Sequence, residues 1–159
     1  MIRRSVFPLA VALLVSFGNV PLGYSQPAAD EYAGAETCAG CHEDLVKGWK
    51  TTRHAKAFVT LQKKHQETLS HCLKCHVTGF EKEGGFMDGE LTPQFTGVQC
   101  EVCHGAAAAH AANPDNKKGL IVSPGESTCR ECHTKGQDPK FDFQNKKLLV
   151  HGAVKKGGK

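Results

Sequence analysis

One short pattern occurs four times in this sequence: a cysteine, two variable residues, a second cysteine and a histidine. The four copies use all eight cysteines of the 159-residue chain, so none remains for a disulfide bond. The two residues between the cysteines differ in every copy, as expected if they only bridge the two thiols. The copies are Cys38-Ala-Gly-Cys41-His42, Cys72-Leu-Lys-Cys75-His76, Cys100-Glu-Val-Cys103-His104 and Cys129-Arg-Glu-Cys132-His133.

This spacing is typical of covalent attachment of a c-type haem. The two thiols add to vinyl groups on one porphyrin edge, and the next residue then lies under the ring, where its imidazole binds the iron. Two zinc sites of four cysteines would use the same residues, but zinc does not require a histidine after every second cysteine. The pattern therefore predicts four haem c groups, with His42, His76, His104 and His133 as iron ligands. A zinc-stabilised structural module is the weaker alternative.

The first 25 residues resemble a secretory signal peptide. Arg3 and Arg4 precede an apolar run from Val6 to Phe17, and small residues follow up to Ser25. A membrane anchor is less favoured, because the run is short for a span of about 20 apolar residues. We expect cleavage near Ser25, export to the periplasm, and no stable membrane anchor afterwards. Residues 26–159 would then form one tetrahaem domain.

Four haems in a domain of this size leave little polypeptide to cover each porphyrin. Only 7% of the residues are aromatic, which also suggests that the porphyrins form much of the core. The expected fold is therefore mainly α with much irregular loop, in a compact domain whose core is stacked c-type haems.

Hydrophobic periodicity predicts where some of the helices lie. An apolar face at helical spacing predicts a helix within residues 43–69. Residues 77–99 contain five glycines and read as a loop with a short hairpin at most. The alanine-rich residues 106–112 favour a helix that stops at Asn113-Pro114. The residues of the apolar face are His54, Phe58, Leu61, His65 and Leu69.

The second face of each haem iron decides between electron transfer and small-molecule chemistry. Met87 is a weak candidate ligand, because it lies in the glycine-rich loop. His54 lies on the predicted apolar helical face, and His110 follows His104 too closely to reach around the same ring. His151 ends the apolar stretch 148–150, which favours a buried position. The remaining candidates are His65, which is balanced between ligand and exposed residue, and His71, which we expect to be structural or exposed.

The motifs and histidines together resemble the tetrahaem cytochrome c-554 family. The resemblance runs through the first motif with Trp49 and Thr-Arg-His54-Ala-Lys-Ala, then CLKCHVTGF, GVQCEVCHG with His110, and CRECHTKGQDPKFDF leading to His151. It implies a mostly helical, haem-packed domain in which closely stacked porphyrins transfer electrons in the periplasm.

The resemblance also implies partners for the motif histidines. It suggests that His54 binds the haem of His104, that His110 binds the haem of His42, and that His151 binds the haem of His133. The haem of His76 would then lack a protein ligand on its far side. Residues 138–141 would lie above that haem.

Two functions follow as expectations. The first is electron transfer by mostly bis-histidine, low-potential haems between redox partner proteins. The second is a redox enzyme, or a nitric oxide binding protein, that acts at one five-coordinate haem. The basic segment 140–159 has six lysines and a single acidic residue, and we expect a solvated terminus there in preference to a docking patch for an acidic redox partner. Nucleic acid is not an expected partner.

Overall fold

The structure is a computed structural model that describes residues 31–152. The predicted signal peptide and the end of the lysine-rich tail lie outside these residues. The described chain is mainly helical with much loop and contains no sheet, as predicted; its one β-bridge pairs Val77 with Thr96. The helices are α1 (Ala35–Lys50), α2 (Ala57–Gln62), α3 (Ser70–Leu73), η1 (Pro93–Phe95), α4 (Cys100–His104), α5 (Ala108–Ala112), α6 (Glu126–Arg130), α7 (Phe143–Lys146) and η2 (Lys147–Leu149).

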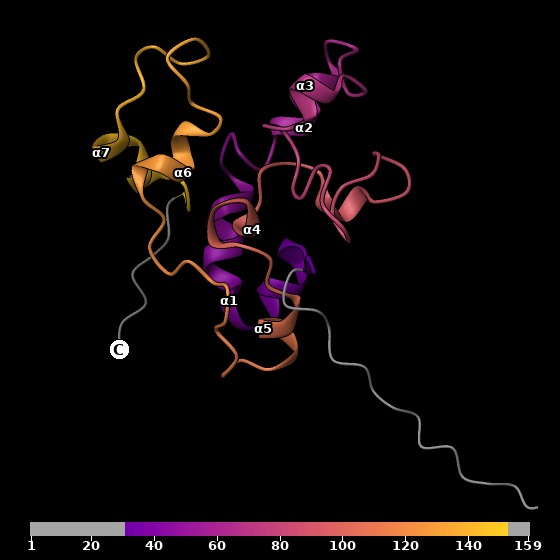
Figure 1. Cartoon of the computed structure of the whole chain (residues 1–159), viewed down its shortest axis with the longest axis vertical. Helices are drawn as coiled ribbons and strands as arrows, with labels where there is room; N and C mark the ends of the chain where they lie inside the picture. The colour runs from indigo at the N-terminus through magenta and orange to yellow at the C-terminus, as the bar shows by residue number, and fades with distance from the viewer. Residues whose placement is uncertain (1–30, 153–159) are drawn as a thin grey trace, which may run out of the picture.

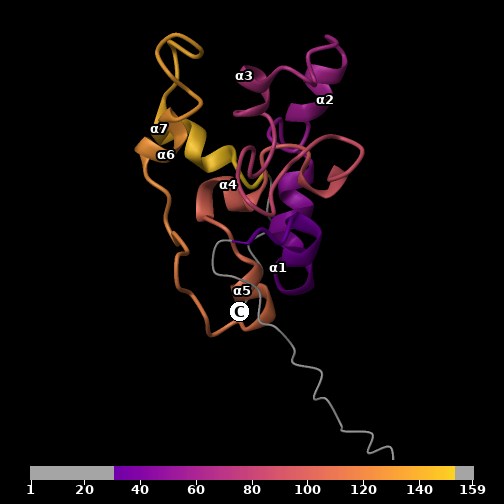
Figure 2. The same cartoon turned by 45° about the vertical axis from the view of Figure 1, so that its right-hand side comes forward.

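Helices α1 and α4 occupy the middle of the molecule (Figure 1). Helices α2 and α3 lie to one side of them, α6 and α7 to the other, and α5 lies beside α1 in both cartoon views. Figure 2 shows the C-terminal segment running from α7 toward α4. Of the helices that carry the motifs, α1 and α4 therefore lie in the middle, while α3 and α6 lie on opposite sides of them.

The helix predicted within residues 43–69 is interrupted, and this corrects the prediction. Helix α1 ends at Lys50, and a turn over residues 51–56 precedes α2. The hydroxyls of Thr51 and Thr52 donate to the carbonyls of Gly48 and Trp49, both at 2.7 Å. Such side-chain bonds compete with the helical ladder and favour its end. As a result His54 lies in a turn.

The far end of the predicted apolar face also differs from the expectation. Phe58 and Leu61 are buried, as the periodicity predicts. His65 is exposed and has a φ of 53°, a left-handed conformation that ends the helical register. Leu69 is 39% exposed. The apolar stripe therefore extends over a single turn of helix.

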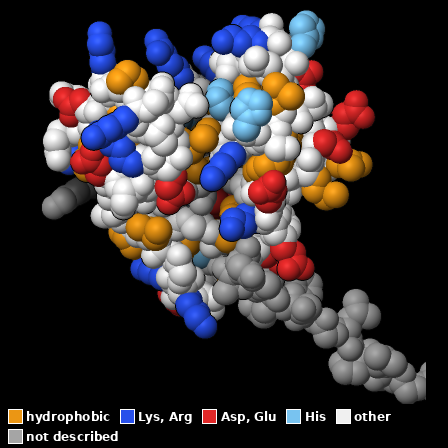
Figure 3. All heavy atoms as spheres, turned by 45° about the horizontal axis from the view of Figure 1, so that its top comes forward, with side chains coloured by type: hydrophobic (Ala, Val, Ile, Leu, Met, Phe, Trp, Pro, Cys, Tyr) orange, Lys and Arg blue, Asp and Glu red, His pale blue; other side chains and the backbone are white. Residues whose placement is uncertain are grey.

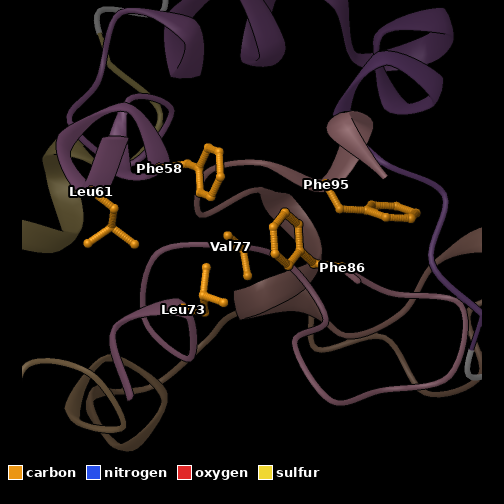
Figure 4. Packing of buried hydrophobic residues seen from close by; sticks show 6 residues of the cluster. All are labelled: Phe58, Leu61, Leu73, Val77, Phe86 and Phe95. Atoms are coloured by element: carbon orange, nitrogen blue, oxygen red, sulfur yellow. The ribbon is translucent and has the colours of Figure 1, made fainter. Parts of the chain in front are cut away.

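Residues 77–99 form a loop that closes a small hydrophobic cluster (Figure 4). Its aromatic contact is between Phe58 and Phe86, whose ring centroids are 5.5 Å apart. Cys72 of the second motif packs against the same cluster. The cluster therefore joins α2, α3 and the loop into a support for the second motif. Its buried members are Phe58, Leu61, Leu73, Val77, Phe86 and Phe95.

A second cluster joins the first and third motifs. Val46 and Trp49 of α1 are buried, and Cys38 and Cys100 pack against them. The indole nitrogen of Trp49 donates to the carbonyl of Val98 at 2.9 Å, just before α4. The shared packing holds α1 against α4. These two clusters are the only ones formed by buried side chains within residues 31–152.

Glu101 adds a polar clamp at the same place. Its side chain is buried, with 3% of the residue exposed. One carboxylate oxygen accepts from the backbone N–H groups of Ala33 at 2.8 Å and Ala107 at 2.9 Å, and the other accepts from Gly34 at 2.8 Å. The carboxylate thereby ties the segment before α1 and the segment before α5 to α4.

Candidate haem-binding site

Each motif lies at a point where a helix ends or bends. Helix α1 bends at His42, whose φ and ψ of −118° and 42° are not helical. Helix α4 ends at His104 and is followed by Gly105 with a φ of 87°. The second and fourth motifs begin in α3 and α6 and continue into turns. A single helical turn thus presents the two thiols, and the break after it redirects the backbone at the histidine.

The motif thiols contact one another in pairs. Cys38 hydrogen-bonds to Cys100, which raises the pKa of the Cys38 thiol and lowers that of Cys100 to about 7. Burial, and then a hydrogen bond with Cys75, raises the pKa of Cys132 to about 12. These contacts place the first motif beside the third and the second beside the fourth.

The two pairs lie near each other through Cys103 and Cys129. Burial and the neighbouring charge of Cys129 raise the pKa of Cys103 to about 11. Cys103 belongs to the third motif and Cys129 to the fourth. The motifs therefore form one continuous series in the order first, third, fourth, second, which differs from their order in the sequence.

Four of the candidate ligands have a hydrogen-bonded Nδ1 atom. His76 contacts the carbonyl of Ala57 at 2.8 Å, and His104 contacts that of Ile121 at 2.7 Å. His110 contacts the carbonyl of Asn116 at 3.1 Å, and His133 contacts the Oδ2 atom of Asp138 at 3.0 Å. Because these oxygens only accept, Nδ1 carries the proton in each ring. The Nε2 atom is then left to bind iron, as in metal-binding histidines generally.

Two motif histidines face a second imidazole. The ring centroids of His104 and His151 are 6.2 Å apart, and those of His54 and His133 are 6.1 Å apart. Imidazole nitrogen binds a metal ion at about 2 Å, so two imidazoles on opposite sides of one iron have centroids about 6 Å apart. The observed spacing therefore fits one iron between each pair. Burial and the facing histidine lower the pKa of His54 and of His151, which favours the neutral, metal-binding form.

These pairs favour a different assignment from the one that the resemblance implied. His54 lies beside His133 and not beside His104, and His151 lies beside His104 and not beside His133. The reason is that the C-terminal segment runs back to α4, while the turn that carries His54 faces the fourth motif. His151 is also exposed instead of buried, because the single-turn helix η2 leaves Leu148 and Leu149 on the surface.

The remaining predicted ligands are not paired with a second imidazole within residues 31–152. Helix α5, which carries His110, lies beside α1, which carries His42, in both cartoon views (Figures 1 and 2). The pairing of these two histidines stays a prediction. Within residues 31–152, His76 has no ring contact with another histidine, and both His65 and His71 are exposed.

Residues 138–141 contact the fourth motif. The ring of Phe141 stacks on His133 with centroids 4.5 Å apart, and Asp138 contacts the same imidazole. The position of this segment above the haem of His76 stays a prediction. The sequence indicated the segment through its resemblance only; neither Asp138 nor the clamping carboxylate of Glu101 was identified as a functional residue.

The zinc alternative requires several ligands to converge at one point. Within residues 31–152, no group of three or more histidine, cysteine and acidic side chains is arranged to hold a metal ion. The thiols instead contact one another in the pairs described above, each at the end of a helical turn followed by its histidine. The donor set and the paired imidazoles fit haem, and the fold and site define a multihaem c-type cytochrome.

Comparison with known proteins agrees with this class. Residues 37–105 match the family of cytochrome c554 and c-prime. The cytochrome c-554 of Nitrosomonas europaea is 31% identical over 157 aligned residues, which cover 86% of this chain and 66% of that protein. The structure of reduced cytochrome c554 from Nitrosomonas europaea has the same fold, with a TM-score of 0.63 and 24% identity over 80% of this chain and 86% of that one. The chain belongs to the cytochrome c-554 family.

Proposed function

We propose that this protein is a periplasmic electron carrier with four covalently bound haem c groups. Residues 1–25 would direct export and be removed, and residues 26–159 would form the tetrahaem domain. Membership of a multihaem cytochrome family and the four complete attachment motifs support this proposal. Haem supplies the one-electron chemistry, while the chain supplies attachment, axial ligands and spacing.

The proposed ligand sets follow the geometry of the imidazoles. His104 and His151 would bind the third haem, and His133 and His54 the fourth. His42 would bind the first haem together with His110. His76 would bind the second. Ligation without methionine favours low potentials.

The series of thiol contacts is the observation that carries the proposed function. A thioether joins each cysteine to the edge of its porphyrin, so two cysteines in contact bring two porphyrin edges together. Cys38 contacts Cys100 and Cys132 contacts Cys75, while Cys103 lies close enough to Cys129 to feel its charge, so the haems would follow one another in the order first, third, fourth, second. Haems attached in this series would pass electrons from one to the next, and a carrier needs no substrate pocket.

An alternative is small-molecule chemistry at the second haem. Within residues 31–152 neither His76 nor His42 has a ring contact with another histidine, but His110 is proposed as the second ligand for His42, which leaves His76 without one. A five-coordinate iron there would bind nitric oxide or support a redox enzyme.

Haem content and spectra of the mature protein test both possibilities. We expect four haems per chain by pyridine haemochrome assay, with at least three low-spin signals by EPR. Four low-spin haems that bind neither carbon monoxide nor nitric oxide would support electron transfer and contradict the alternative. One high-spin haem that takes up the gas would support the alternative, and fewer than four haems would contradict the proposed cofactor content.

The proposed partners are a donor and an acceptor protein of the redox class. Lysine, arginine and acidic side chains are interspersed on the face shown in Figure 3, so no patch of a single sign dominates that face. No helix within residues 31–152 has the length and apolar character to span a membrane. Nucleic acid is not a proposed partner.

A further inference from the structure

The motif histidines differ in the group that holds Nδ1. For His76 and His104 the acceptor is a neutral backbone carbonyl. For His133 it is the carboxylate of Asp138, with 3.0 Å between Nδ1 and Oδ2. Among the motif histidines with a hydrogen-bonded Nδ1 in residues 31–152, His133 is thus the one that contacts a charged acceptor.

The surrounding chain places Asp138 firmly. The N–H of Asp138 donates to the carbonyl of Thr134 at 2.8 Å, and its carbonyl accepts from Phe141 at 3.1 Å. Phe141 is buried and covers the imidazole of His133. The loop between His133 and Phe141 is therefore a closed turn built around the histidine, and Asp138 sits at the point where it reaches Nδ1.

Arg130 completes this arrangement without neutralising Asp138. Its guanidinium lies 4.7 Å from the centre of the Phe141 ring and donates to the carbonyls of Phe141 and His133, both at 3.2 Å. Its ionic partner is Glu126, at 3.0 Å. The arginine therefore braces the turn, while its charge is already matched by another carboxylate.

A charged acceptor changes the histidine as an iron ligand. Hydrogen bonds to a carboxylate are stronger than those to a neutral carbonyl. A carboxylate on the far nitrogen makes the imidazole a better donor, and a better donor stabilises ferric over ferrous iron. On this basis, and resting on the proposed haem at the fourth motif, we infer that Asp138 is a positioning residue that lowers the reduction potential of the haem bound by His133.

The third haem is the natural reference for the reduction potential of the fourth. Its proposed ligands, His104 and His151, are also two imidazoles, but the Nδ1 partner of His104 is the Ile121 carbonyl. The Asp138 effect therefore separates the potentials of two neighbouring haems that have the same ligand types. Since the fourth haem lies between the third and the second in the thiol series, its potential governs passage between them.

The test uses the mature holoprotein with Asp138→Asn, which keeps an oxygen acceptor and removes the charge. We expect one of the four midpoint potentials to rise by about 59 mV or more, a tenfold change in the one-electron equilibrium. The EPR signal of the same haem should shift, while the other potentials stay near their original values. Spectroelectrochemical titration measures all four together.

Glu131→Gln is the matched control, because it removes one charge from the same motif at an exposed residue with no hydrogen bond to His133. It should leave the potential of the fourth haem almost unchanged, and Asp138→Glu should keep that potential low. Equal shifts in Asp138→Asn and Glu131→Gln, or no shift in either, would overturn the inference. If Asp138→Asn does not assemble, loss of the low potential in a correctly assembled Asp138→Glu would overturn it, and retention would support it. A missing fourth haem in the unaltered protein would refute the proposed cofactor content itself, which the haem count reveals separately.

Discussion

His104 and His151 face each other with ring centroids 6.2 Å apart and ring planes within 16° of parallel. His54 and His133 have nearly the same separation, 6.1 Å, but their planes are inclined by 58°. The structure therefore builds two pairs of histidines with similar spacing and different orientation. In each pair, one member comes from an attachment motif and the other from a distant segment.

This difference predicts two distinct EPR signals. Imidazole planes that are parallel split the iron dxz and dyz orbitals in the same sense, whereas inclined planes partly cancel each other. We expect a rhombic low-spin signal from the third haem and a signal with a larger maximal g value from the fourth. EPR of the fully oxidised protein measures this, and two indistinguishable low-spin signals would contradict it.

Replacing the distant histidine of each pair should identify which haem it serves. We expect His54→Ala to convert the fourth haem to high spin and to leave the third unchanged, because His54 faces His133. His151→Ala should do the reverse. His71→Ala is the control, since His71 is exposed and has no ring contact within the described chain. Loss of the rhombic signal in His54→Ala would support the pairing that the resemblance first implied.

Gly152, the residue directly after His151, lies close against helix α1. It has a φ of 65°, and a methyl group there would overlap the carbonyl oxygen of Gly48 in α1. We expect Gly152→Ala to displace the C-terminal segment and to convert the third haem to high spin. Gly136→Ala, where an added methyl meets only the Thr134 hydroxyl at 3.9 Å, should leave the spectrum unchanged. A low-spin third haem in Gly152→Ala would show that His151 can bind that haem without the close approach of Gly152 to Gly48.

Glu101 should contribute strongly to stability. All three of its contacts are backbone donors, so Glu101→Gln places an NH2 group against an N–H and loses the negative charge. Hydrogen bonds to a buried charged group contribute about 1.5 to 3 kcal/mol each, and we expect a loss of about 2 to 4 kcal/mol. Denaturant unfolding of the holoprotein measures this. Glu90→Gln, at an exposed residue, is the control, and an equally small effect of both changes would refute the role of the clamp.

Local patterns predicted several elements well. The alanine-rich segment forms helix α5, which ends at Ala112 with Asn113 in an extended conformation, as its composition predicts. The glycine-rich residues 77–99 form a loop with only one isolated bridge. The helix expected within residues 43–69 breaks after Lys50, because threonine hydroxyls compete for its last carbonyls and His65 adopts a left-handed conformation. The hydrophobic periodicity of the sequence does not predict either of these two interruptions.

The sequence by itself determined the attachment motifs and the set of histidines available as second ligands. Both depend on local spacing along the chain, since two thiols and the following imidazole act within one helical turn. Only the tertiary structure decided which histidine faces which motif, how the motifs follow one another, and that a carboxylate contacts His133. Those relationships depend on how α1 packs on α4 and where the C-terminal segment returns, and such long-range packing leaves no periodic signal in the residues themselves.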